Sequence, residues 1–68
     1  MSPQLVERLR AAAAAADAAS AAYVSTLVMY GDGAAARQDI VSARASFFQA
    51  LLDLLENVTT ALEESVDG

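Results

Sequence analysis

The second half of the chain carries an apolar pattern that restricts the fold more than any other feature. Its large apolar residues recur at steps of three, four and seven, which is the periodicity of a helix and not of a strand. They are Ile40, Val41, Phe47, Phe48, Leu51, Leu52, Leu54, Leu55, Val58, Leu62 and Val66. At about 100° per residue these side chains cover an arc of roughly 160°, wider than contact with one helix requires. We therefore expect this helix to contact more than one neighbour.

The first half predicts another long helix, from about residue 3 to residue 30. Ser2 suits the N-cap, and Pro3 suits the first helical position, where its missing N–H costs nothing. Residues 11–22 are alanine apart from Asp17 and Ser20, and alanine is the best intrinsic helix former. One stripe at three- and four-residue steps consists of Leu5, Leu9, Ala12, Ala16, Ala19, Tyr23, Leu27 and Tyr30.

The sequence Gly31-Asp32-Gly33 separates the two predicted helices. We expect Gly31 to take the left-handed conformation that follows a helix, and Asp32 to cap the second helix, from about residue 34 to residue 66. So short a connection makes the helices antiparallel neighbours. With the turn centred near residue 32, positions whose numbers add up to about 64 face each other. Alanines of the first helix then lie opposite the large residues 47–52 of the second.

The size of the chain indicates self-association. A chain of 68 residues is near the lower limit at which a domain buries enough surface alone, and 17 of its residues are alanine. A single hairpin gives each helix only one neighbour. We predict a single all-α domain over residues 1–68: a two-helix antiparallel hairpin (about 3–30 and 34–66) that assembles as a homodimeric four-helix bundle.

Composition argues against several function classes. Nine acidic residues against four arginines give a net charge of −5, so nucleic acids and acidic membrane surfaces are poor partners. Lys, His and Cys are absent, which removes most catalytic bases and nucleophiles, thiolate ligands and the Glu-x-x-His metal motif of helical bundles. Asp17 interrupts the apolar residues 11–30, which argues against a membrane-spanning helix. We expect a soluble cytoplasmic protein that is not an enzyme and has no cofactor or metal.

Protein interaction is the function class that remains. Residues expected at an oligomer or partner interface are Tyr23, Leu27, Tyr30, Ile40, Val41, Phe47, Phe48, Leu51, Leu52 and Leu55. Val24, Val28 and Met29 make the turn end more apolar than a solvated tip, as dimer core or as a docking patch for a partner protein. The first hypothesis is a small non-enzymatic interaction or scaffold protein. The alternative is an acidic regulator or inhibitor that occludes a basic site on a partner protein.

Two finer predictions concern the apolar arc of the second helix. Phe47 and Phe48 diverge by about 100°, so one ring should pack inside the hairpin and the other across the subunit interface. Arg44 falls inside the arc, and Asp17 lies near the same level on the first helix, beside Ser20. We predict that Arg44 pairs with Asp17, within a hairpin or across the dimer, and fixes the helix register. The alternative is an Arg44 whose guanidinium bends out to water.

Overall fold

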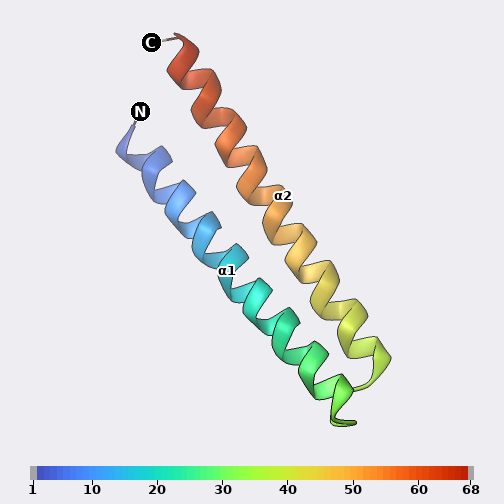
Figure 1. Cartoon of the computed structure of the whole chain (residues 1–68). Helices are drawn as coiled ribbons and strands as arrows, with labels where there is room; N and C mark the ends of the chain where they lie inside the picture. The colour runs from blue at the N-terminus through green and yellow to red at the C-terminus, as the bar shows by residue number, and fades with distance from the viewer. Residues whose placement is uncertain (1, 68) are drawn as a thin grey trace.

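The computed structural model describes residues 2–67, and the side chains of residues 2–65. Two α-helices, α1 (Pro3–Gly31) and α2 (Arg37–Asp67), lie side by side and antiparallel, as Figure 1 shows. The chain therefore forms a rod whose Cα atoms span 53 × 15 × 12 Å, with both termini at one end. The predicted all-α hairpin is confirmed.

The first helix begins where the sequence predicts. The Ser2 hydroxyl accepts a hydrogen bond from the Leu5 backbone N–H at 3.2 Å, and Pro3 occupies the first turn. This N-cap satisfies one of the backbone donors that the first turn of a helix leaves without a partner.

The turn differs from the prediction in which glycine is left-handed. Gly31 is the last residue of α1, and Gly33 takes the positive φ of 78°. The Gly33 N–H donates to the Tyr30 carbonyl at 3.1 Å, and the Ala34 N–H donates to the Met29 carbonyl at 2.7 Å. These two bonds form a Schellman motif, in which the left-handed residue follows the C-cap, here Asp32. The prediction for Gly31 was wrong because the helix continues through it.

The start of α2 also differs from the prediction, because the helix begins at Arg37 and not near residue 34. The carboxylate that caps it belongs to Asp39, whose Oδ2 accepts from the Ala36 N–H at 2.8 Å. Asp32 ends α1 instead, so its predicted capping role was wrong. An acidic side chain in the first turn also interacts favourably with the helix dipole.

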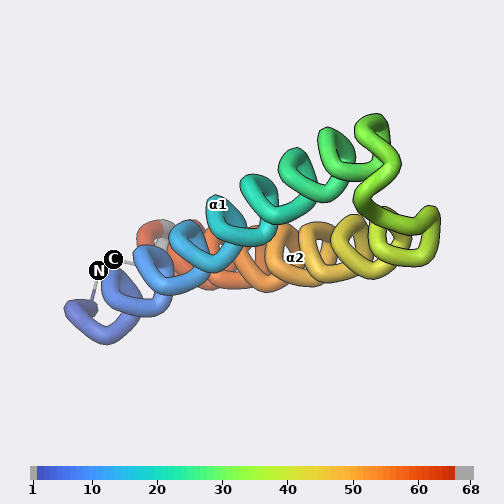
Figure 2. The backbone as a smooth tube through the Cα atoms, turned by 90° about the horizontal axis from the view of Figure 1, so that it is seen from below, coloured from blue at the N-terminus to red at the C-terminus, as the bar shows by residue number. Residues whose placement is uncertain are grey.

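The contact between the helices consists of one heptad series on each, which we call the inner seam. On α1 it contains Leu5, Leu9, Ala12, Ala16, Ala19, Tyr23 and Thr26, and on α2 it contains Ile40, Ala43, Phe47, Ala50, Leu54, Asn57 and Ala61. All of these side chains are buried or half-buried. Alternating steps of three and four are the geometry of an antiparallel coiled coil, and Figure 2 shows the two helices crossing as they pack.

Alanine dominates the inner seam, and this determines how much the hairpin buries. Leu5, Ala12, Ala16 and Ala61 are the buried hydrophobic residues of the described chain, and three of these four are alanine. Small side chains let two helices approach closely, but each removes little apolar area from water. The hairpin is therefore closely packed and has a small core.

The two turn glycines provide a matched test of this geometry. Gly33→Ala should destabilise the protein by about 1–2 kcal/mol, because an L side chain is strained at positive φ. Gly31→Ala should be neutral or stabilising by up to about 1 kcal/mol, because Gly31 is helical and open space surrounds its added Cβ. Urea unfolding at one fixed chain concentration measures both. Equal effects of the two substitutions would contradict the assigned turn.

Candidate protein-interaction surface

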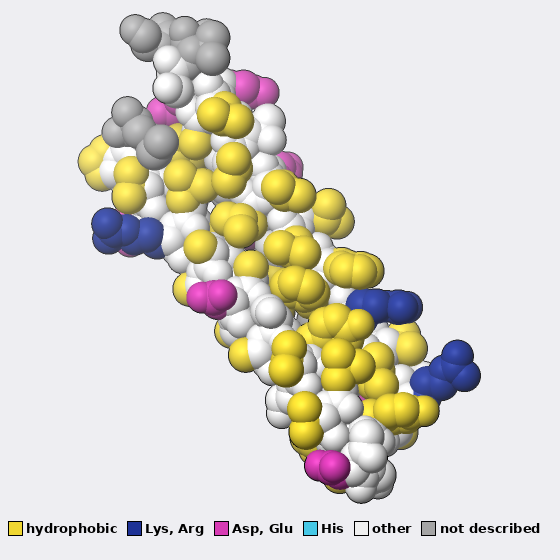
Figure 3. Space-filling view, in the orientation of Figure 1, with side chains coloured by type: hydrophobic (Ala, Val, Ile, Leu, Met, Phe, Trp, Pro, Cys, Tyr) yellow, Lys and Arg dark blue, Asp and Glu magenta, His cyan; other side chains and the backbone are white. Residues whose placement is uncertain are grey.

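A second apolar series runs along α2 beside the inner seam, and we call it the outer stripe. Its members are Val41, Phe48, Leu51, Leu52, Leu55, Val58 and Leu62. All except the half-buried Leu51 are exposed, with Phe48 at 53%, Leu62 at 62% and Leu52 at 65% of full exposure. Figure 3 shows hydrophobic side chains gathered along α2 on the face turned to the viewer. Large exposed apolar patches on soluble proteins mark interaction sites.

The outer stripe has the spacing of a helix-packing seam. Residues 41, 48, 55 and 62 and residues 44, 51 and 58 alternate at steps of three and four, rotated by about 100° from the inner seam. Thr59 lies at its edge, and its hydroxyl donates to the Leu55 carbonyl of the same helix at 2.9 Å. The stripe can therefore lose its water here without leaving that hydroxyl unpaired.

A smaller group of exposed apolar residues covers the turn end of α1, and we call it the turn-end patch. It contains Val24, Leu27, Val28, Met29 and Tyr30. Leu27 and Tyr30 were expected in the stripe that faces α2, but the inner seam continues through Thr26 instead. The Thr26 hydroxyl donates to the Ala22 carbonyl at 2.8 Å, so this half-buried polar residue is satisfied by its own helix.

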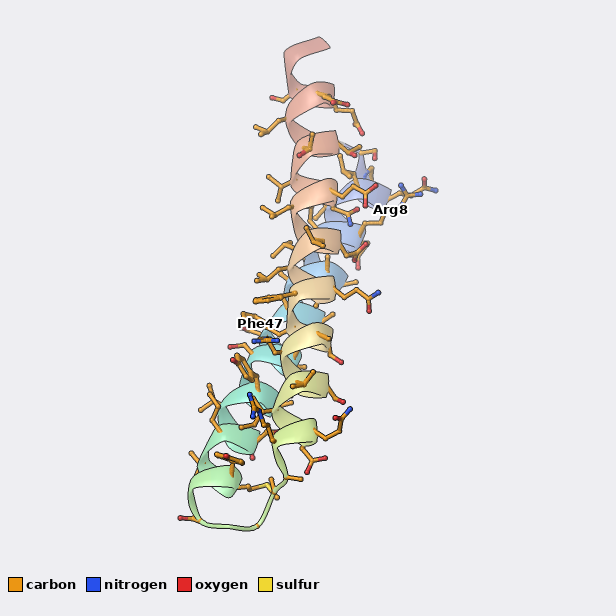
Figure 4. The ribbon with its side chains drawn as sticks, turned by 90° about the vertical axis from the view of Figure 1, so that its right-hand side faces the viewer. Arg8 and Phe47 are labelled. Carbon is orange, nitrogen blue, oxygen red and sulfur yellow. The ribbon has the colours of Figure 1, made fainter. Side chains whose placement is uncertain are left out.

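The opposite face of the hairpin is polar. Arg8, Asp53 and Asn57 line a shallow hollow together with three alanines of α1. Figure 4 shows Arg8 projecting from the side of the hairpin away from Phe47. The Asn57 side-chain amide donates to the Asp53 carbonyl at 2.8 Å, a bond within α2. The hollow arises because alanine side chains are too short to fill the groove beside them.

The structure divides the predicted interface residues into three groups. Tyr23, Ile40 and Phe47 lie in the inner seam, where the Tyr23 and Phe47 ring centroids are 6.0 Å apart. Val41, Phe48, Leu51, Leu52 and Leu55 belong to the outer stripe, and Leu27 and Tyr30 to the turn-end patch. Only the last two groups offer exposed surface to another molecule.

Val58 and Leu62 complete the outer stripe and were absent from the predicted interface. Ala43, Ala50 and Ala61 were likewise absent from the contacts expected between α2 and α1. The signal was present in the sequence, because both sets continue unbroken heptad series. Attention to large residues alone hides a seam in which half of the positions are alanine.

The neighbouring phenylalanines point to different surroundings. Phe47 is half-buried against Tyr23 of α1, whereas Phe48 lies on the outer stripe, with its ring centroid 6.2 Å from that of Phe47. Phe47 therefore takes the place inside the hairpin that the sequence assigned to one of the two rings. The role of Phe48 across a subunit interface stays a prediction.

Arg44 and Asp17 do not form an ion pair within the described part of the hairpin, and both are exposed. Among residues 2–65 the ion pair found is Arg10 with Glu7, at 4.0 Å between two exposed side chains. Such a surface pair contributes little stability. The predicted contact between Asp17 and Arg44 across a dimer stays a prediction.

Two further properties bear on function. Within the described residues, no three or more Asp, Glu, His or Cys side chains are grouped so that they could hold a metal ion. By length and composition alone, the 29-residue α1 could cross a membrane, and most of it is exposed in the hairpin. Comparison with known proteins returns no matching family model, no curated relative and no solved structure at a significant level.

The positions of Phe47 and Phe48 give a second prediction. Phe47→Ala should lower the free energy of unfolding by about 2–3 kcal/mol, below the 3–5 of a fully buried ring, and should weaken any dimer less than Phe48→Ala does. Phe48→Ala should raise the dimer dissociation constant at least tenfold, because its ring lies on the outer stripe. Sedimentation of both variants over a dilution series measures the difference. A weakened dimer in the Phe47 variant alone would contradict the assignment.

Proposed function

We propose that this chain is a small non-enzymatic helical interaction protein that acts through self-association and through docking to a partner protein. The observation that carries the proposal is the outer stripe, a long apolar seam on α2 that Arg44 interrupts and that has no neighbour in the hairpin. A soluble chain that keeps such a seam needs a second surface to cover it.

The accessible surface of the hairpin supports this proposal. It is 4938 Å², whereas a compact monomer of 7.0 kDa exposes about 4,000 Å². The excess of about 900 Å² is close to the roughly 800 Å² that one partner contributes to a standard protein interface. Covering one face of the rod would bring the exposed area of each chain down to that of an ordinary small domain.

The turn-end patch supports the docking part of the proposal. Val24 and Val28 are more than half exposed, and they lie on α1, away from most of the outer stripe. Apolar surface that continues from α2 onto the turn end of α1 fits a protein that binds itself along α2 and another protein at the turn end. Docking there uses aliphatic side chains and the Tyr30 ring, so the partner surface is an apolar groove or helix face.

A second candidate function rests on the polar face. Asp53, Glu56, Glu63 and Glu64 are exposed on α2, and no ion pair engages them within residues 2–65. An acidic regulator would present these carboxylates to a basic site on its target. Binding of this kind weakens steeply with salt, whereas apolar self-association does not, so salt dependence separates the two functions.

Self-association is tested by mass. Sedimentation equilibrium at micromolar concentration should give at least twice the 7.0 kDa of one chain. Leu55→Glu should return the mass to that of one chain, because it places a carboxylate within the outer stripe. Gln49→Glu adds the same charge on the polar face and should leave the mass unchanged. A folded wild-type monomer at these concentrations would refute the proposal.

A further inference from the structure

The surface that best matches the chemistry of the outer stripe is the same stripe on α2 of a second copy. The flank of α1 on the same side of the hairpin carries two charges, Arg10 and Asp17, in its middle part, as its heptad places them. The flank also contains Val6, Ala13, Ser20, Val24 and Leu27. A second copy that laid α1 on the outer stripe would press those charges against leucines. A second copy that lays α2 there joins large apolar side chains to large apolar side chains.

Charge selects the relative direction of the two α2 helices. Arg37 and Arg44 lie in the first half of α2, and Glu56 and Glu63 lie in the second half. A parallel pair would set Arg44 against Arg44 and Glu56 against Glu56. An antiparallel pair sets the arginine half of each helix against the glutamate half of the other. Opposite charges then meet, so the antiparallel orientation is favoured.

We propose that two copies join through antiparallel α2 helices on a two-fold axis, with Leu51 opposite Leu55 and Phe48 opposite Val58 of the partner. This proposal rests on the self-association proposed above. It corresponds to a register in which facing residue numbers add up to about 106. The two α2 helices then overlap over nearly their whole length, since residue 39 faces residue 67.

Arg44 distinguishes this register from its neighbour, one heptad away. In the proposed register Arg44 lies opposite Leu62 near the end of the interface, where its guanidinium stays in contact with water. A shift of one heptad would place Arg44 opposite Leu55, in the middle of the seam. A charge at the end of an apolar interface keeps its water, and a charge at the centre loses its water.

The proposed dimer is a four-helix bundle in which the turn end of each hairpin stays uncovered. The inner seam and the outer stripe point about 100° apart on α2, so the four helices occupy the corners of a square, with α1 beside its partner α1. In this register the partner α1 begins near the level of residue 23, because facing residues of the two inner-seam series add up to about 66. The turn-end patch, residues 24–30, therefore extends beyond it at each end. Two equivalent patches remain uncovered, which is where a partner protein would dock.

Spin-label distances test the arrangement, because the chain has no cysteine and single-cysteine variants label cleanly. Ser42→Cys, Gln49→Cys and Glu56→Cys lie seven residues apart on the exposed polar side of α2. In the proposed dimer the label pairs at 49 and 56 should give nearly equal short distances. The pair at 42 should be clearly longer. Its axial separation is about 33 Å, against about 12 Å at 49 and about 9 Å at 56, from the rise of 1.5 Å per residue.

Each other result overturns the proposal in a different way. Equal distances at all three sites would mean a two-fold axis parallel to the helices, as in a parallel α2 pair or a dimer in which α1 lies antiparallel on the partner α2. Similar long distances at 42 and 56 with a short one at 49 would mean the register shifted by one heptad. In both cases self-association stands and this arrangement fails. If no dipolar coupling appeared and the mass was that of one chain, both the self-association and this arrangement would be refuted.

Discussion

The structure depends on an inner seam in which about half of the positions are alanine. Two long helices joined by a short turn must pack against each other, and small side chains let their backbones come close. The same small side chains bury little apolar area, so the seam alone contributes little of the hydrophobic free energy that a folded chain needs. The large apolar residues of α2 cannot all fit between helices this close. They form a second series on the outside, and the exposed outer stripe is a direct consequence of the alanine seam.

Under the proposed self-association, folding and association are coupled. Backbone order costs free energy at every residue, and in a chain of this size a single pair of helices returns only part of it through burial. A second copy placed on the outer stripe adds Phe48, Leu52 and Leu55 to a shared core. The caps at Ser2 and Asp39 and the Schellman turn at Gly33 fix where each helix begins or ends, but such local bonds contribute only about 1 kcal/mol each. Local structure thus sets the shape of the hairpin, and in the proposed dimer the outer stripe is the main remaining source of stability.

The sequence predicted the helices because each is a long segment with helical periodicity, bounded by helix-breaking residues. It failed at the turn, where Gly31, Asp32 and Gly33 all suit a helix end and only the hydrogen-bond pattern decides among them. It predicted that Phe47 and Phe48 serve different contacts but not which ring packs inside the hairpin, because a wide apolar arc does not show which part faces the other helix. The alanines at 43, 50 and 61 resolve that question, since they continue the heptad through Phe47. The partner surface has no such marker, because nothing in a single chain identifies the molecule that covers it.

The central claim is that the hairpin depends on a second copy for much of its stability. Urea unfolding followed by helical circular dichroism, at chain concentrations spanning three decades, tests it most directly. The account predicts that the unfolding midpoint rises at every step, because each tenfold increase in concentration favours a dimer by about 1.4 kcal/mol. A fully helical protein whose midpoint is the same at every concentration would contradict it.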